Sequence, residues 1–258
     1  MILNDKIYID KSKIGNKFKK ILRNFARYKN PEFFKRKRMN YSTYNIKAFI
    51  DCSEEDDNYL IFPRGNYDDI YKFCLSNKIS MEISDKRNSG KYINTTFNGK
   101  LREEQEIVLN NMIKHDIGIL QAPPGYGKTI LALKLIDTKK VNTLIITNRR
   151  DILRQWKNKI KVLLNIDAGE ISGDKINITK VIDVAIINSL SKKETMRGIL
   201  KEYGMVIVDE CHHASAPTYV NILNSTNAKH VYGFTQLQIE KMAELLLNLC
   251  SVVISFTK

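Results

Sequence analysis

Residues 117–137 combine a short apolar run, a loop rich in glycine and proline, and a helical apolar pattern, and this order limits the possible folds more than any other feature. The run 117–120 is typical of a buried parallel strand, and the apolar residues from Ile130 to Leu135 recur with helical spacing. The breakers between them are Pro123, Pro124, Gly125 and Gly127. A glycine loop at a helix N-terminus turns backbone N–H groups and the positive end of the helix dipole toward an anion. The segment therefore predicts a phosphate-binding loop in an α/β fold.

The loop matches the pattern G-x-x-x-x-G-K-[ST] except at its first position, where Ala122 replaces glycine. Because alanine is small enough for the turn, we expect Lys128 to reach the β and γ phosphates of a nucleotide and the Thr129 hydroxyl to ligate Mg²⁺. A simpler interpretation, in which Gly-Lys-Thr only caps a helix, fits the preceding strand less well. The expected cofactor-binding residues of the loop are Ala122, Pro123, Pro124, Gly125, Tyr126, Gly127, Lys128 and Thr129.

A second apolar strand, 205–208, runs directly into a pair of carboxylates, Asp209 and Glu210. We expect Asp209 to hold hydrated Mg²⁺ and Glu210 to orient and polarise the attacking water. Cys211, His212 and His213 also suggest zinc, but no second Cys/His pair lies at finger spacing, so a zinc site is not favoured.

Strands expected at 141–146 and 181–187 alternate with a helix at 151–163, which indicates right-handed parallel crossovers and ligands at the carboxyl ends of the strands. Polar residues on that rim are nucleic-acid candidates, although ordinary loop polarity explains them equally well: Thr147, Arg149, Ser189 and Lys192. A helix beginning at 101 and ending near Met112 places Gln105 close to the phosphate loop. Its amide can read an adenine edge, while the plainer alternative is a solvated side chain.

Positive charge is concentrated at the N-terminus. The chain carries a formal net charge of +14, and residues 1–50 contain 14 Lys/Arg against three Asp/Glu, a surplus of 11. A basic amphipathic helix is expected at 17–28, followed by the basic run Lys35, Arg36, Lys37 and Arg38. This pattern favours contact with DNA phosphates, with interleaved Phe and Tyr stacking on bases. The alternatives are a membrane surface as the partner, and a core position for Phe18, Leu22 and Phe25.

The first 90 residues predict a small basic α+β domain. Strands are expected at 59–62 and 79–83, a helix at 67–76, and a linker at 85–90, so that residues 1–90 and 91–258 form two domains. The N-terminus lacks the apolar region of a signal peptide, no run is long enough to span a membrane, and the four cysteines form no C-x-x-C pair. These features lead us to expect a cytoplasmic location and no membrane partner.

The motifs from 96 to 235 resemble, in their order, the first RecA-like lobe of superfamily II helicases of the DECH/DEAH branch, which includes excision-repair-type and phage recombination helicases and type III restriction subunits. Leu101-Arg102 with Gln105 resembles the adenine motif, 122–129 motif I, 144–149 with Gln155-Trp156 motif Ia, and 209–212 motif II. The segments 169–175 and 186–190 resemble strand-contacting motifs. Within the predicted N-terminal domain 1–90, the stretch from Asn30-Pro31 through Arg64-Gly65 resembles, less closely, the small DNA-recognition domain that precedes this lobe in some relatives. The resemblance implies ATP and Mg²⁺ as cofactors and DNA as partner, with Glu210, Asp209, Lys128 and His212 as catalytic residues.

The sequence departs from the family after motif III, because Gly233-Phe234-Thr235 is followed by Gln236-Leu237 instead of Ala-Thr. In the family a second lobe supplies an arginine finger, and the 23 residues after Thr235 are too few to form it. We therefore expect a truncated lobe with weak ATPase activity at most, unable to unwind DNA without a lobe supplied in trans. A non-enzymatic DNA-binding accessory protein and a helicase fragment with a separate partner chain remain alternatives. A helix at 239–249 and a strand at 252–256 are expected in the tail.

Overall fold

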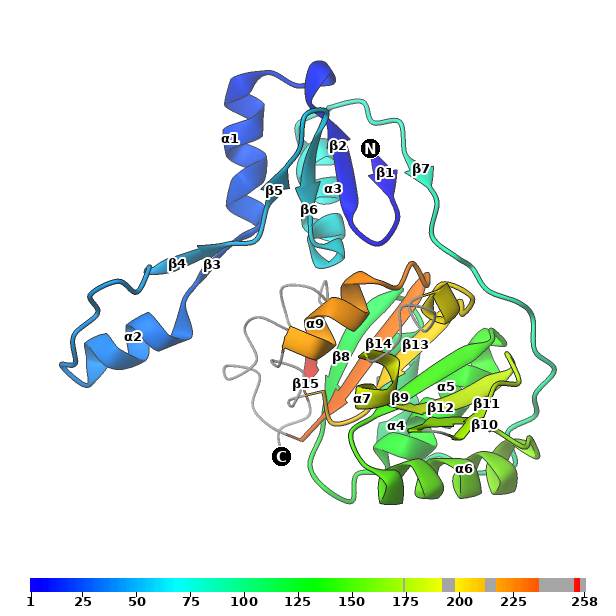
Figure 1. The fold of residues 1–258 in the computed structure, drawn as a ribbon. Helices are drawn as coiled ribbons and strands as arrows, with labels where there is room; N and C mark the ends of the chain where they lie inside the picture. The colour runs from blue at the N-terminus through cyan, green and yellow to red at the C-terminus, as the bar shows by residue number, and fades with distance from the viewer. Residues whose placement is uncertain (174, 192–197, 212–216, 237–252, 256–258) are drawn as a thin grey trace.

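The computed structural model of the protein describes residues 1–173, 175–191, 198–211, 217–236 and 253–255. It contains two main sheets, each built from its own part of the chain (Figure 1). No helix among these described residues is long and apolar enough to span a membrane. The smaller sheet belongs to the N-terminal part and the larger one to the rest.

The N-terminal part is a five-stranded mixed sheet with two helices, in the strand order β5-β6-β2-β1-β7. Its elements are β1 (Ile2–Leu3), β2 (Ile7–Asp10), α1 (Asn16–Phe25), β5 (Glu54–Glu55), β6 (Tyr59–Phe62), α3 (Tyr67–Ser76) and β7 (Ser84–Asp85), with short 3-10 turns at Lys11–Lys13 and Arg64–Asn66. The predicted strand 59–62 and helix 67–76 are confirmed. The predicted strand 79–83 is wrong, since the pairing segment is β7, which follows it.

An arm projects from this small domain (Figure 1). It consists of a two-stranded ribbon, β3 (Arg27–Lys29) and β4 (Phe49–Asp51), and a helix between them, α2 (Pro31–Arg38). The helix predicted over 17–28 therefore ends too late: α1 stops at Phe25, and the residues after Ala26 pair as β3. Asn30 caps α2 through a side-chain bond to the Glu32 N–H, and Pro31 opens the helix without needing an N–H partner.

Both aromatic residues of α1, Phe18 and Phe25, pack against the core of the small N-terminal part. Phe18 and Phe25 pack against Phe73 of α3, and Leu22 is fully buried. Phe18 and Phe25 are partly buried by this packing, which leaves less of each ring for stacking on a base. The alternative interpretation, a core position, is the one that the structure supports.

The larger part is a RecA-like α/β sheet of eight strands in the order β11-β10-β12-β9-β13-β14-β8-β15, all parallel except for the β10–β11 pair. The strands are β8 (Ile117–Gln121), β9 (Thr143–Thr147), β10 (Gly169–Ser172), β11 (Lys175–Asn177), β12 (Ile182–Ile186), β13 (Met205–Val208), β14 (His230–Thr235) and β15 (Val253–Ser255). The helices are α4 (Glu103–Met112), α5 (Lys128–Lys139), α6 (Arg150–Leu164), α7 (Ile187–Ser191) and α9 (Pro217–Asn224). The predicted α/β class and the tail strand are confirmed, while the tail helix 239–249 lies outside the described residues.

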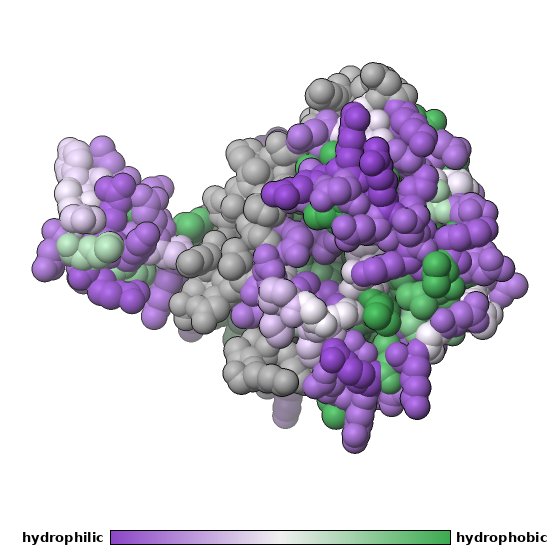
Figure 2. Space-filling model, turned by 90° about the horizontal axis from the view of Figure 1, so that it is seen from below, coloured by the Kyte–Doolittle hydropathy of each residue, from purple (hydrophilic) through white to green (hydrophobic). Residues whose placement is uncertain are grey.

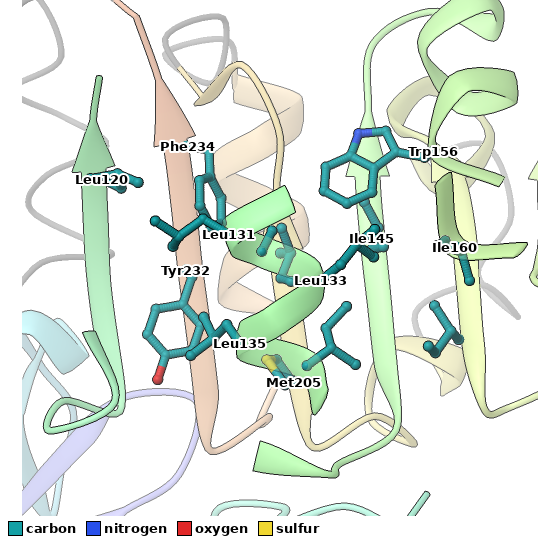
Figure 3. Packing of buried hydrophobic residues seen from close by; sticks show 14 of the residues in the cluster. Leu120, Leu131, Leu133, Leu135, Ile145, Trp156, Ile160, Met205, Tyr232 and Phe234 are labelled. Carbon is teal, nitrogen blue, oxygen red and sulfur yellow. The ribbon is translucent and has the colours of Figure 1, made fainter. Parts of the chain in front are cut away.

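Two apolar clusters cover the two faces of this sheet. On one face, α4, α5 and α6 pack over the strands, with Leu131, Leu133, Leu135 and Trp156 in the core (Figure 3). Fully buried parallel strands of this kind are apolar along their whole length, as the predicted runs were. The core thus holds the strand ends, and the loops that follow them, in a fixed arrangement.

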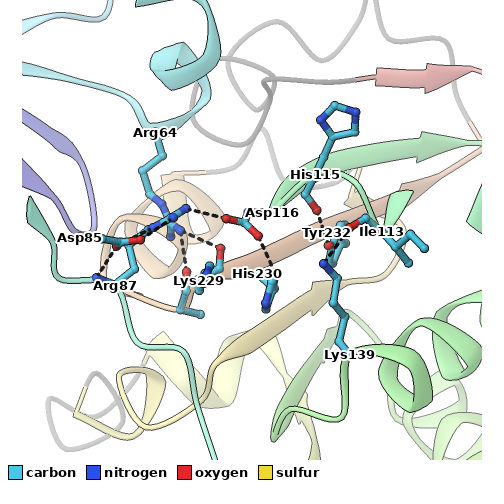
Figure 4. A network of polar contacts seen from close by, with 11 residues as sticks. Arg64, Asp85, Arg87, Ile113, His115, Asp116, Lys139, Lys229, His230 and Tyr232 are labelled. Atoms are coloured by element: carbon cyan, nitrogen blue, oxygen red, sulfur yellow. Dashed lines mark hydrogen bonds and ion pairs between the residues drawn. The ribbon is translucent and has the colours of Figure 1, made fainter. Parts of the chain in front are cut away.

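The N-terminal part and the larger part of the structure meet at the amino ends of β8 and β14, in a polar network (Figure 4). The buried Arg64 donates from Nη2 to the carbonyl oxygens of Ala228 and Lys229, at 2.6 and 3.3 Å. Arg87 pairs with Asp85 at 2.7 Å and with Asp116 at 3.2 Å, and Asp116 also lies 3.2 Å from His230. The predicted linker 85–90 is therefore held against the larger sheet by the ion pair of Arg87 with Asp116 and by an isolated β-bridge between Asn88 and Ala228.

Candidate nucleotide-binding site

The phosphate loop connects β8 to α5 at the carboxyl edge of the large sheet. Gly125 and Gly127 have φ angles of 77° and 90°, a region that side-chain-bearing residues rarely adopt. A Cβ atom added to Gly127 would lie 2.6 Å from the Gln105 amide nitrogen, so this glycine is also required by space. Pro123, Pro124 and Gly125 are exposed at the tip. The sequence between strand and helix thus folds into the turned loop that an anion cradle requires.

Lys128, the first residue of α5, folds back over this loop. Its Nζ donates to the carbonyl oxygens of Ala122 and Pro123, at 3.0 and 3.3 Å. The ammonium group is only partly buried and has a third N–H. Phosphate oxygens are charged and therefore better acceptors than these carbonyls, so the same ammonium can turn to a nucleotide without any movement of the core.

Gln105 lies against the loop instead of in solvent. It is 3% exposed, its Nε2 donates to the Tyr126 carbonyl at 2.7 Å, and its Oε1 accepts from the Arg102 N–H at 2.9 Å. The amide fastens α4 to the phosphate loop, and each of its polar atoms has capacity for one more hydrogen bond. Arg102 stacks over the Tyr126 ring at 5.5 Å, next to the same loop.

The carboxylate of Asp209 stands at the end of β13, in the middle of the same edge. Its Oδ2 accepts a 2.7 Å hydrogen bond from the Trp156 indole, and its Oδ1 accepts from the Glu210 N–H at 3.0 Å. Burial raises the pKa of Asp209 above its usual value, against the opposing effects of these two donors and of the Lys128 charge. Glu210 has a φ of 48°, which turns the chain sharply after the strand.

The donor set at this edge fits magnesium. Asp209 offers carboxylate oxygens, Thr129 offers a hydroxyl next to Lys128, and both are hard oxygen ligands of the kind that Mg²⁺ prefers. The cost of burying the Asp209 charge is a physical reason for a cation to sit here, because a divalent ion favours the ionised carboxylate. His212, the remaining predicted catalytic residue, lies outside the described residues.

The structure describes three of the four predicted rim residues. Arg149 is exposed at the start of α6. The Ser189 hydroxyl, in α7, accepts a 2.7 Å hydrogen bond from the N–H of Gly173 in the turn after β10. Thr147 is a wrong prediction: it is fully buried and its hydroxyl bonds the Arg149 carbonyl at 3.3 Å, so its side chain cannot reach a nucleic acid. Lys192 lies outside the described residues.

The basic run predicted to bind DNA stands elsewhere. Lys35, Arg36, Lys37 and Arg38 are all exposed on α2 of the arm, and Arg36 pairs with Glu32 at 3.0 Å. The arm projects away from the large sheet (Figure 1), and the described surface of the body seen from below is mainly hydrophilic (Figure 2). The structure thus separates the two candidate nucleic-acid surfaces, the arm and the rim, that the sequence analysis treated together.

Sequence reasoning missed two neighbours of the site, Trp156 and Arg102. Both were quoted only as parts of motifs, without roles. The usable signal for Trp156 was its position in the apolar stripe of α6, two turns after the carboxyl end of β9. Nothing in its sequence neighbourhood pointed to Asp209, which is 53 residues away.

Known families and proteins resemble this chain over the same region. The family described as "Type III restriction enzyme, res subunit" matches residues 98–237. A probable helicase of Escherichia phage T5 is 32% identical over 157 residues, which are 61% of this chain and 34% of that protein. A DNA 3'-5' translocase of Sulfurisphaera tokodaii is 30% identical over 120 residues, 46% of this chain and 27% of its own length. The chain thus spans about a third of the length of the curated relatives it matches.

Two solved structures share the fold. The UvsW helicase of bacteriophage T4 superposes with a TM-score of 0.63 at 15% identity, covering 93% of this chain and 94% of that one. The SWI2/SNF2 ATPase core of Sulfolobus solfataricus, solved with double-stranded DNA, gives 0.54 at 15% identity, with 64% and 38% covered. Since the family match covers more than half of the chain, and the fold and motif order agree with it, the protein belongs to the type III restriction enzyme res subunit family and contains the first ATP-binding lobe of a superfamily II helicase.

Proposed function

We propose that this lobe binds ATP with Mg²⁺ at the phosphate loop and hydrolyses it in response to DNA held by the arm and the rim. The observation that carries the proposal is that the phosphate loop after β8 and Asp209 after β13 lie at the same carboxyl edge of one parallel sheet. A strand-end carboxylate beside a phosphate loop is the arrangement used for phosphoryl transfer.

Each residue has a definite task in this proposal. Lys128 and the backbone N–H groups of the loop hold the β and γ phosphates, and Gln105 with Arg102 faces the base. Thr129 and Asp209 hold Mg²⁺, which neutralises charge on the phosphates when bound. Glu210 orients the attacking water and accepts its proton. His212 is the remaining catalytic candidate.

Unwinding of a duplex requires a second surface over the nucleotide. The exposed tip of the phosphate loop, Pro123 to Gly125, leaves one side of the site open. We propose that a second lobe, in the same or another polypeptide, closes on this side and supplies a cation to the transition state. These 258 residues alone are then expected to show weak hydrolysis and no strand separation, even at high protein concentration.

A steady-state ATPase assay of the purified 258 residues, without DNA and with single- or double-stranded DNA, tests the proposal. Stimulation by either DNA supports it. Binding of DNA that responds to ATP, without any hydrolysis, would support instead an accessory protein that senses nucleotide. Absence of both ATP and DNA binding would contradict the proposed function.

The DNA surface can be located by salt dependence. Removing one phosphate-binding side chain lowers the slope of log K against log salt by about 0.7 to 0.9. Replacing the four basic residues of α2 by glutamine should lower the slope by about 2 to 3, because one of them is already paired with Glu32. A comparison variant of the rim replaces three exposed arginines at the start of α6 by glutamine: Arg149, Arg150 and Arg154. If only the rim variant changes the slope, the arm has no part in DNA binding.

A further inference from the structure

The tryptophan of α6 contacts the predicted magnesium site directly. Trp156 is 2% exposed and is the single tryptophan of the chain. Its Nε1 lies 2.7 Å from Oδ2 of Asp209. Figure 3 shows its ring above Ile145, at the end of the core nearest the carboxyl ends of the strands. The core side chain and the carboxylate are therefore joined across two elements, α6 and β13.

The geometry restricts rotation of the carboxylate. Both of its oxygens are held, one by the indole and the other by the Glu210 N–H. The indole ring is 2% exposed and belongs to the same apolar cluster as Leu153, Ile160 and Leu133, so close packing restricts its movement, and its N–H can only donate. Each carboxylate oxygen keeps a further lone pair, which the hydration shell of a cation can use.

We propose that Trp156 is a positioning residue, whose indole N–H holds the Asp209 carboxylate in the orientation that receives the magnesium of Mg·ATP. The inference rests on the proposed function and adds to it a residue of the core. Groups that fix a metal-binding side chain change metal affinity by about 10- to 100-fold when removed.

The competing explanation is that the bond only satisfies a buried indole. Buried tryptophans find an acceptor for their N–H in most proteins, and the ring itself supports α6. A structural role of that kind predicts a loss of stability in Trp156 variants and no specific change in the use of Mg²⁺. The two explanations differ in the ratio of ATP affinities with and without the metal.

Calorimetric titration of ATP, in Mg²⁺ and in EDTA, measures this ratio. In Trp156→Phe, which keeps an aromatic ring and loses the N–H, we expect the gain in affinity from Mg²⁺ to fall about tenfold, with the affinity in EDTA unchanged. The control is Ile160→Val, one turn further along the same buried face of α6, which disturbs packing but leaves the bond to Asp209. An equal gain from Mg²⁺ in parent and Trp156→Phe would overturn the inference.

The single tryptophan allows two further checks on the intact protein. If Trp156→Phe does not fold, the tryptophan can be replaced during expression by an isostere with sulfur in place of the N–H, and the same ratio measured. In the unmodified protein, fluorescence excited at tryptophan reports on the surroundings of Trp156, which include Asp209. Mg·ATP should shift the emission of the parent but not of Asp209→Asn. No ATP binding under any condition would refute the proposed function itself, whereas ATP binding with unchanged emission and an unchanged ratio would refute only the role of Trp156.

Discussion

The two edges of the large sheet are both lined with charged residues, but they differ in what those charges contact. At the amino edge, Arg64, Arg87, Asp116 and His230 contact one another or backbone carbonyls across the domain junction. At the carboxyl edge, Lys128 and Asp209 contact the loop and a core tryptophan, and face solvent in part. Charges that pair with one another and with backbone carbonyls across a junction hold two parts of the fold together, whereas charges that keep bonding capacity at a strand end can receive a ligand.

This difference predicts opposite behaviour for variants at the two edges. Changes at the carboxyl edge should alter nucleotide use without altering stability. Changes at the amino edge should alter stability without altering nucleotide affinity.

The largest expected effect is that of Lys128→Ala. Removing the ammonium group takes away its contacts to the β and γ phosphates, and we expect ATP affinity to fall at least about a hundredfold, to the limit of calorimetric detection. The melting temperature should remain that of the parent, since the side chain bonds only loop carbonyls. Equal ATP affinity in variant and parent would refute the assignment of the phosphate loop.

Glu210→Gln should separate binding from hydrolysis. The amide keeps the shape of the side chain but cannot accept a proton from water, so the rate of ATP hydrolysis should fall about a hundredfold while ATP affinity stays within a factor of two or so. Single-turnover hydrolysis and calorimetry on the same sample measure the two quantities. A loss of binding instead would indicate that Glu210 supports the turn after β13.

Arg64→Met is the matching test at the amino edge. It removes two charge-assisted hydrogen bonds and also the cost of burying a guanidinium, so a net loss of about 2 kcal/mol in the free energy of unfolding is expected. Burial lowers the pKa of Arg64 to about 10, so the group is still charged at neutral pH. Arg38→Met, at an exposed site on α2, serves as control and should change stability little. Urea unfolding measures the stability of both variants. Weaker ATP binding in Arg64→Met would contradict the expectation that changes at the amino edge leave nucleotide affinity unaltered.

The carboxyl edge could be predicted from the sequence because its chemistry lies in short contiguous segments. Ala122 to Thr129 joins strand β8 to helix α5, and Asp209-Glu210 follows strand β13 directly. Their meeting follows from the parallel order of the strands. The amino edge could not be predicted, because Arg64 finds its acceptors 164 residues further along the chain. Trp156 was missed for the same reason. The end of α1 was missed because helix propensity cannot register the pairing of Arg27 with Asp51 in another strand.

The smallest expected effect is a pH dependence at the amino edge. Burial lowers the pKa of His230 below its usual 6.5, so the folded protein takes up this proton less readily than the unfolded chain. The contribution of His230 to the free energy of unfolding should therefore be constant above pH 7 and be lost as the pH falls through 6.5. Asp116 remains ionised there: burial opposes its charge, but His230, Arg87 and Lys229 hold its pKa at about 2, so its contribution is lost only between about pH 4 and 2.

Urea unfolding of the parent and of His230→Asn at pH 8, 7, 6 and 5 checks this sign. The free energy of unfolding of the variant should fall less between pH 7 and pH 5 than that of the parent, because the variant has no imidazole to protonate. The same decline in both proteins would assign it to other groups.

The most direct test of the difference between the edges is hydrogen–deuterium exchange with and without Mg·ATP. The account predicts slower exchange of the backbone N–H groups from Gly125 to Thr129 and at Asp209 and Glu210, with no change at Asp116 or at 228–230. Protection at the amino edge, or unchanged exchange in the phosphate loop under conditions where ATP is bound, would contradict it.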